Sequence, residues 1–161
     1  MVQEQQLKKH LSTLVSGKGA HADFDTAVKG ISSDHYGAEV KGLPYTLWQI
    51  VEHMRLSQND ILDYMRNPDY KERSWPEGYW PKEGKPPKKD SWDQSVKSIK
   101  KDLREVKTII ENPKTDLFAQ VPHGEKGHTI LREVLLIADH NAYHVGQIIV
   151  IRRLLGDWKG L

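Results

Sequence analysis

The stretch TILREVLLIADHNAYHVGQIIVIRRLL, residues Thr129–Leu155, predicts one long amphipathic helix and decides the fold class. Within it, His140 and His144 stand four residues apart. Positions i and i+4 differ by roughly 40° around a helix axis, so the two imidazoles project side by side. This spacing lets a helix offer two nitrogen ligands to one metal ion, but a stable site usually requires a third ligand from elsewhere. The alternative is a pair of core or interface histidines that do no chemistry.

Three further helical patterns precede this one, and each has a recognisable start or stop signal. No run of alternating apolar and polar residues marks a strand. We therefore predict a single all-α domain over residues 1–161, a four-helix bundle of up-down or crossover winding with long inter-helix loops. The upstream helices are expected from near Gln3, with a short continuation over Ala22–Lys29; from Pro44, as first helical residue, to Asn67; and from Asp90, as N-cap, to Asn112.

Composition narrows the function classes. The chain has 161 residues, a formal net charge of +2 and no cysteine. The near-neutral charge predicts no nucleic-acid or membrane partner. The lack of cysteine excludes a disulfide scaffold, a cysteine zinc site and a protein thiolate nucleophile. The N-terminal residues lack the pattern of a signal peptide, and no apolar run is expected to span a bilayer, so the cytoplasm is the expected compartment.

His53 is the candidate for the third ligand. It lies midway along the second predicted helix, between the core positions Ile50 and Met54. One imidazole from this helix facing the pair on the last helix would make a three-histidine site with open positions, as in a catalytic metal centre. Nitrogen ligands favour zinc, nickel, copper or iron over magnesium or calcium, with zinc and nickel as the first choices.

Other metal and nucleophile motifs are absent or poor. A carboxylate-bridged di-iron centre needs paired Glu-x-x-His motifs on helices. The one such motif here, Glu125–His128, lies in a glycine-containing loop. The sequence also lacks a His-Glu-x-x-His protease helix, a glycine-rich phosphate loop and a G-x-S-x-G nucleophile elbow.

Several residues near the three histidines are candidate helpers. Gln49 and Ser57 flank His53 at i−4 and i+4, and Glu133 lies two turns before His140. Each could orient an imidazole or a substrate, because metal-bound histidines usually donate their second N–H to a partner. The alternative is that they are ordinary polar residues of a helix bundle with no role at the site. Trp80 belongs to an aromatic loop that could wall a pocket; Trp75 in the same loop is expected to cover the core.

Four segments together resemble the DinB-like (YfiT-like) metalloenzyme family over nearly the full length of the chain. The most distinctive is LREVLLIADHNAYHVGQ at residues 131–147, and it is joined by GAHADFD at 19–25, LWQIVEHMR at 47–55 and WPEGYWP at 75–81. The resemblance implies a four-helix bundle, commonly a homodimer. It also implies a divalent metal held by three histidines, which by motif are His53, His140 and His144.

The resemblance also suggests a reaction. Characterised members of the family include thiol-dependent S-transferases and a mycothiol-dependent isomerase, so transfer of a low-molecular-weight thiol to a small electrophile is the leading hypothesis. The thiol would come from the substrate side. A metal-dependent hydrolase and a non-catalytic metal-binding or interaction protein are the alternatives.

Overall fold

The computed structural model describes residues 2–159 as an all-helical molecule. No strand occurs in this part of the chain, and the one β-bridge joins Gln120 to Thr129. The elements are α1 (Val2–Val15), α2 (Phe24–Val28), a single 3-10 turn (Ser33–His35), α3 (Leu47–Arg66), α4 (Ser91–Glu111) and α5 (Ile130–Leu154). The all-α class and the four long helices agree with the prediction.

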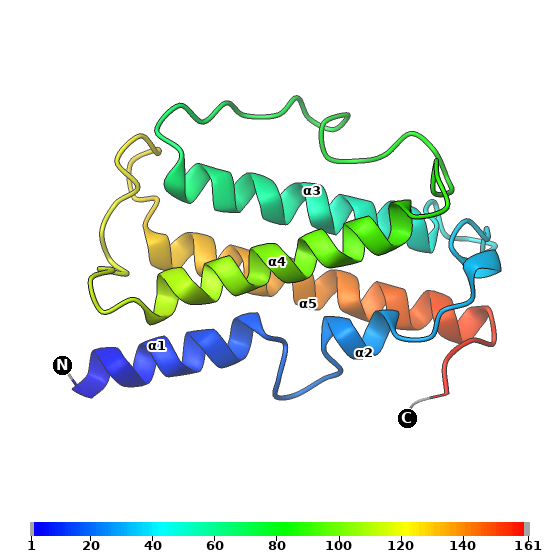
Figure 1. The fold of residues 1–161 in the computed structure, drawn as a ribbon, viewed down its shortest axis with the longest axis horizontal. Coiled ribbons are helices and arrows are strands. Elements are labelled where there is room, and N and C mark those ends of the chain that lie inside the picture. The colour runs from blue at the N-terminus through cyan, green and yellow to red at the C-terminus, as the bar shows by residue number, and fades with distance from the viewer. Residues whose placement is uncertain (1, 160–161) are drawn as a thin grey trace.

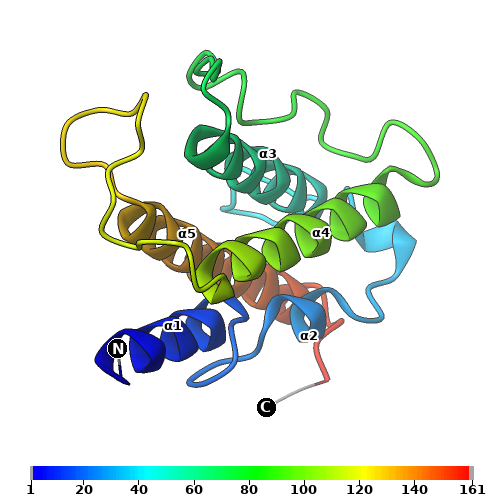
Figure 2. The same cartoon turned by 60° about the vertical axis from the view of Figure 1, so that its left-hand side comes forward.

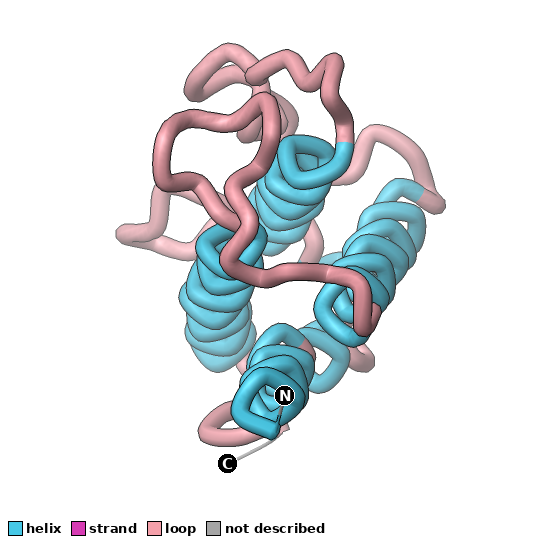
Figure 3. The backbone as a smooth tube through the Cα atoms, turned by 90° about the vertical axis from the view of Figure 1, so that its left-hand side faces the viewer, coloured by secondary structure: helices cyan, strands magenta, loops and turns pink. Residues whose placement is uncertain are grey.

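The four long helices form a bundle with a crossover. α3 packs against α4 and α5, and α1 also packs against both, so α1 and α3 occupy opposite corners (Figure 3). Figure 1 shows that α3 and α4 run in the same direction, while α1 and α5 run in the opposite one. The connection from α3 to α4 must therefore return along the whole bundle, and it does so over the outside of α3 (Figures 1 and 2).

The predicted helix boundaries hold at most ends, with one clear correction. The second predicted helix was expected to begin at Pro44, but α3 begins at Leu47, because Thr46 and Gln49 form a reciprocal capping box there. Thr129 is the N-cap of α5, and its side chain accepts a hydrogen bond from Arg132 N. Asp90 is the N-cap residue of α4 but makes no capping bond with its side chain.

The apolar core divides into two clusters along the bundle. One lies among α2, the first half of α3 and the last half of α5, and it includes Trp92. The other joins α1 to the opposite ends of α3, α4 and α5. The expectation for Trp75 is wrong: its side chain is 71% exposed and does not cover the core.

α5 is also the one described helix that is long and apolar enough to cross a membrane, contrary to the expectation that no run reaches that length. Length and composition alone are weak evidence, because the core helix of a soluble protein passes the same test. Here 44% of its most apolar stretch is buried inside the bundle. The buried part of this stretch packs against α1, α2 and α3.

Candidate metal centre

Three histidines from two helices meet between α3 and α5. His140 Nε2 lies 3.1 Å from His53 Nε2 and 3.2 Å from His144 Nε2. One nitrogen from each ring lies within 4.8 Å of the other two. The structure thus brings together the three residues that the sequence analysis selected as metal ligands.

Burial keeps these imidazoles neutral. His53 and His144 are each only 5% exposed, and His140 is half-buried. Burial lowers the pKa of His140 to about 3, with the charges of His144 and His53 as the next causes. Burial lowers the pKa of His144 to about 4 and also lowers that of His53. Near neutral pH the three rings therefore carry lone pairs, which is the protonation state that a metal requires.

The α3–α4 connection fixes the ring of His53 from its edge and its face. His53 Nδ1 lies 2.8 Å from the carbonyl oxygen of Tyr79, which can only accept, so Nδ1 carries the proton and Nε2 presents its lone pair. Trp80 stacks on the same imidazole, with ring centroids 3.9 Å apart and planes 6° from parallel. The adjacent residues Tyr79 and Trp80 thus set both the tautomer and the orientation of His53.

The connection is held to α3 by a buried carboxylate. Asp60 Oδ2 accepts hydrogen bonds from the hydroxyls of Tyr79, at 2.8 Å, and Tyr70, at 3.0 Å. Burial and this carboxylate raise the pKa of Tyr79 to about 12, so its hydroxyl remains a donor. Asp60 and His53 lie two turns apart on α3, and Tyr79 bridges them. Its hydroxyl donates to Asp60, and its carbonyl oxygen accepts from His53.

His144 is oriented within α5 itself. Its Nδ1 lies 2.7 Å from Gln147 Oε1, and Gln147 Nε2 donates to the hydroxyl of Tyr45 at 2.8 Å. With Gln147 in this orientation, Nδ1 of His144 donates and Nε2 is free to bind a cation. The second nitrogens of His53 and His144 therefore both have acceptors, as metal-bound histidines require.

The donor set fits a divalent transition metal. Typical zinc–nitrogen bonds of about 2.0–2.1 Å place two tetrahedral ligands about 3.3 Å apart, close to the observed separations of 3.1 and 3.2 Å. A hydrogen bond with the side chain of Asn141 raises the pKa of His140, against the larger lowering by burial. The Nε2 atoms of His53 and His144 both present lone pairs toward Nε2 of His140. A cation bound among these three Nε2 atoms would satisfy all of them together.

The four predicted helper residues lie at different distances from this centre. Trp80 stacks on His53 and does wall the site. Ser57 Oγ is 3.4 Å from His53 Nδ1, a longer contact than that of the Tyr79 carbonyl. Gln49 caps α3 and donates to the carbonyl of Pro81 at 3.4 Å, so it holds the loop beside Trp80.

Glu133 makes its contacts elsewhere. Its carboxylate pairs with Arg132 at 2.6 Å and lies 4.0 Å from His128. The buried Glu133 therefore balances charge near the start of α5. No contact between Glu133 and the three histidines occurs in the described structure, so its proposed part in orienting an imidazole has no geometric support.

Sequence reasoning missed the residues that orient the ligands. Gln147 follows His144 by three residues, so helical spacing could have identified it. Tyr79 acts on His53 through its backbone carbonyl, and side-chain identity gives no signal for such a contact. Asp60 lies seven residues after His53 on the same face of α3, but only the loop shows which groups it binds.

Fold and site together define a class: a crossover four-helix bundle with a three-histidine centre suited to a divalent metal. Comparison with protein families gives a more specific assignment. The family described as the DinB superfamily matches residues 18–148, most of the chain and all three histidines, so this protein belongs to that superfamily. Searches of curated proteins and of solved structures found no match.

The role of Gln147 leads to the first prediction. We expect Gln147→Leu to weaken zinc or nickel affinity by about 10- to 100-fold, because His144 loses the acceptor that orients it. Gln147→Glu keeps an acceptor and is expected to bind metal about as well as the wild-type chain. Competition with a chelating dye measures both affinities. Equal metal affinities of the leucine variant and the wild type would show that Gln147 does not contribute to metal binding.

Proposed function

We propose that this protein is a metal-dependent enzyme whose centre consists of His53, His140 and His144 with bound zinc or nickel. The convergence of their three ring nitrogens carries this proposal. A divalent cation bound there would lower the pKa of a coordinated thiol and polarise an electrophile. The chain supplies the surroundings: neutral imidazoles, a stacked indole and a largely desolvated location between two helices.

The reaction we favour is transfer of a low-molecular-weight thiol to a small electrophile. The sulfur forms a bond to the electrophilic carbon, the leaving group departs with its electron pair, and the thiol proton passes to solvent. The chain has no cysteine, so the thiol must be a second substrate. Membership of the superfamily supports this choice by analogy with its thiol-dependent members.

A surface cavity that shares Tyr45 with the surroundings of the centre, but is not lined by the three histidines, offers room for a small molecule. It has a volume of about 700 Å³ and is lined by residues 39–46, Gln49, Lys82 and Gly84. Tyr45 lies in this wall, binds Gln147 through its hydroxyl and faces Trp80 with ring centroids 6.3 Å apart. We propose that the substrates approach from this side, with Tyr45 and Trp80 as an aromatic wall between cavity and histidines.

Two alternatives use the same three histidines. In the first, the centre hydrolyses a small substrate, with water in place of the thiol. In the second, the metal stabilises the bundle or an interaction surface without catalysis. The experiments below separate the three functions, because they predict different results for metal content, helical structure and turnover.

Metal binding is the first test. Protein purified without a histidine tag should contain about one transition metal per chain, or take up one zinc or nickel ion after chelation. We expect His53→Ala to abolish uptake, while His10→Ala, at an exposed position on α1, leaves it unchanged. Elemental analysis and circular dichroism give the readout. A wild-type chain that takes up neither metal would refute the metal centre; unfolding of His53→Ala would favour the purely structural role.

Turnover is the second test. The metal-loaded protein, incubated with an aryl halide electrophile and a panel of biological thiols, should consume at least one thiol in a reaction that His53→Ala abolishes. The His10→Ala protein serves as the matched control. Absorbance of the thioether product and titration of free thiol measure the rate. If no thiol is consumed but an activated ester is hydrolysed, the protein is a hydrolase and the proposed thiol transfer is wrong.

We also propose that the protein is a cytoplasmic homodimer that acts on small molecules, without nucleic acid or membrane. The net charge of +2 supports the absence of a polyanionic partner. An exposed apolar row on α5 supports self-association: Leu136, Tyr143 and Val150 recur every seven residues. Gly146 lies on the same helix, and an added Cβ there would meet no atom within 4 Å, so a second helix could approach closely.

Light scattering during gel filtration tests the dimer. The wild-type chain should elute at about twice its mass of 18.5 kDa. We expect Val150→Asp to give monomers, because it places a charge in the apolar row. Phe118→Asp is the matched control, since Phe118 is also exposed and lies on the 112–129 connection. Dimers that survive Val150→Asp would show that another surface is used.

A further inference from the structure

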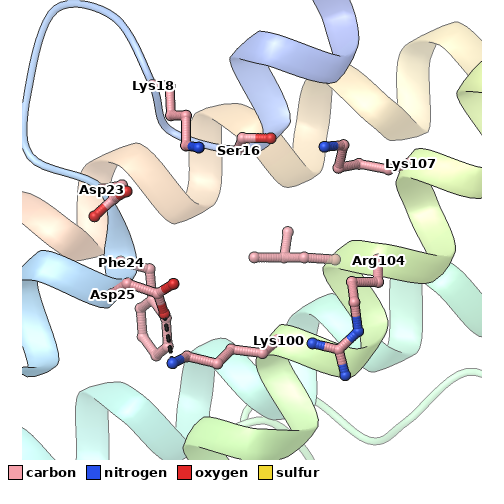
Figure 4. Close-up of a pocket in the computed structure, with 9 residues that line it drawn as sticks. Ser16, Lys18, Asp23, Phe24, Asp25, Lys100, Arg104 and Lys107 are labelled. Atoms are coloured by element: carbon pink, nitrogen blue, oxygen red, sulfur yellow. Dashed lines mark ion pairs between the residues drawn. The ribbon is translucent and has the colours of Figure 1, made fainter.

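A cleft on the other side of the bundle has the properties of a ligand site. It lies between the segment that joins α1 to α2 and one face of α4, and it encloses about 200 Å³ (Figure 4). Lys100, Arg104 and Lys107 line it from α4, and Lys18 lines it from the opposite segment. The three histidines of the metal centre do not line this cleft.

Positive charge exceeds negative charge around the cleft. The four cations face two carboxylates, and each carboxylate already has a partner. Asp25 pairs with Lys100 at 2.7 Å, and Asp23 accepts the backbone N–H of Thr26 at 2.8 Å as the N-cap of α2. Among residues 2–159, no ion pair neutralises Lys18, Arg104 or Lys107. The cleft therefore has a net charge of +2.

The spacing of the cations on α4 is unfavourable for the isolated helix. Lys100, Arg104 and Lys107 stand at i, i+4 and i+7, so they share one face, where like charges repel. Among the residues that line the cleft, the carboxylates are Asp23 and Asp25, and both already have partners. An anion held between these cations would relieve this repulsion. Arg104 presents a guanidinium fork that matches the oxygens of phosphate or carboxylate.

The inner end of the cleft is apolar. Phe24 and Leu103 line both this cleft and a smaller cavity of about 40 Å³ behind it. Asn141 lines the smaller cavity and is 9% exposed. Its Nδ2 donates to Gln58 at 2.7 Å, and its side chain also hydrogen-bonds the ring of His140, so this amide belongs to the surroundings of the metal centre.

We propose that this cleft binds a small phosphate monoester whose organic part is apolar. The charge of such an ester, about −1.5 to −2 at neutral pH, matches the net charge of the cleft. The phosphate lies among Lys18, Arg104 and Lys107. The organic part rests on Phe24 and Leu103.

Calorimetric titration of the chelator-treated full chain at low ionic strength tests the site, with phenyl phosphate as the probe. Chelation keeps the phosphate from binding a metal ion. We expect one equivalent to bind, and the double variant Arg104→Gln, Lys107→Gln to bind at least about tenfold more weakly. The matched control Lys101→Gln, Lys114→Gln removes the same charge from exposed positions and should bind within about twofold of wild type.

The comparison ligands and the location of binding complete the test. Inorganic phosphate and succinate should both bind more weakly than the probe, because neither combines one dianionic group with an apolar ring. Amide shifts on binding should fall at residues 16–25 and 100–107. No binding by wild type, equal loss in both double variants, tighter binding of succinate, or shifts centred on the three histidines would each overturn the proposal. Thermal melting confirms that both double variants are folded.

Discussion

The burial of three neutral imidazoles between α3 and α5 is the constraint on which the rest of the structure depends. A buried ring nitrogen without a partner is costly, and these rings contribute six nitrogens to a region with little water. The Tyr79 carbonyl accepts from Nδ1 of His53, and Gln147 Oε1 accepts from Nδ1 of His144. The remaining inward-facing Nε2 atoms lie 3.1 and 3.2 Å apart, where a single His140 proton can serve only one neighbour at a time and a cation could bind all three.

The topology of the bundle explains how the site acquires its outer wall. Because α3 and α4 are parallel neighbours, their connection must run back along the length of the bundle. In doing so it crosses the outside of α3, where Asp60 binds Tyr79 and the carbonyl of Gly84 accepts from Thr46. A short hairpin between antiparallel helices could not reach His53. The long crossover is therefore a condition for closing the site, and its length of more than 20 residues has a structural reason.

The sequence contained enough to predict the helices and the ligand triad, because both depend on helical periodicity. His140 and His144 share a face by spacing, and His53 lies among core positions of another helix. What periodicity could not provide was the path of the crossover: Trp75 was expected to be buried and is exposed, while the carbonyl of Tyr79 had no sequence signal. The shift of the α3 start from Pro44 to Leu47 has the same origin, since the Thr46 hydroxyl also bonds to the distant Gly84.

A polar bridge through the core fixes the direction in which α5 presents its histidines. Asn141 donates to Gln58 on α3, and Gln58 in turn donates to the carbonyl of Ile99 on α4 at 2.9 Å. Gln58 is almost fully buried, so a rotation of α5 about its axis would break a desolvated hydrogen bond. Asn141 directly follows His140, and the same bridge therefore holds His140 toward His53. Asn141 thus joins α5 to α3 and, through its contact with the ring of His140, helps to set the geometry of the metal centre.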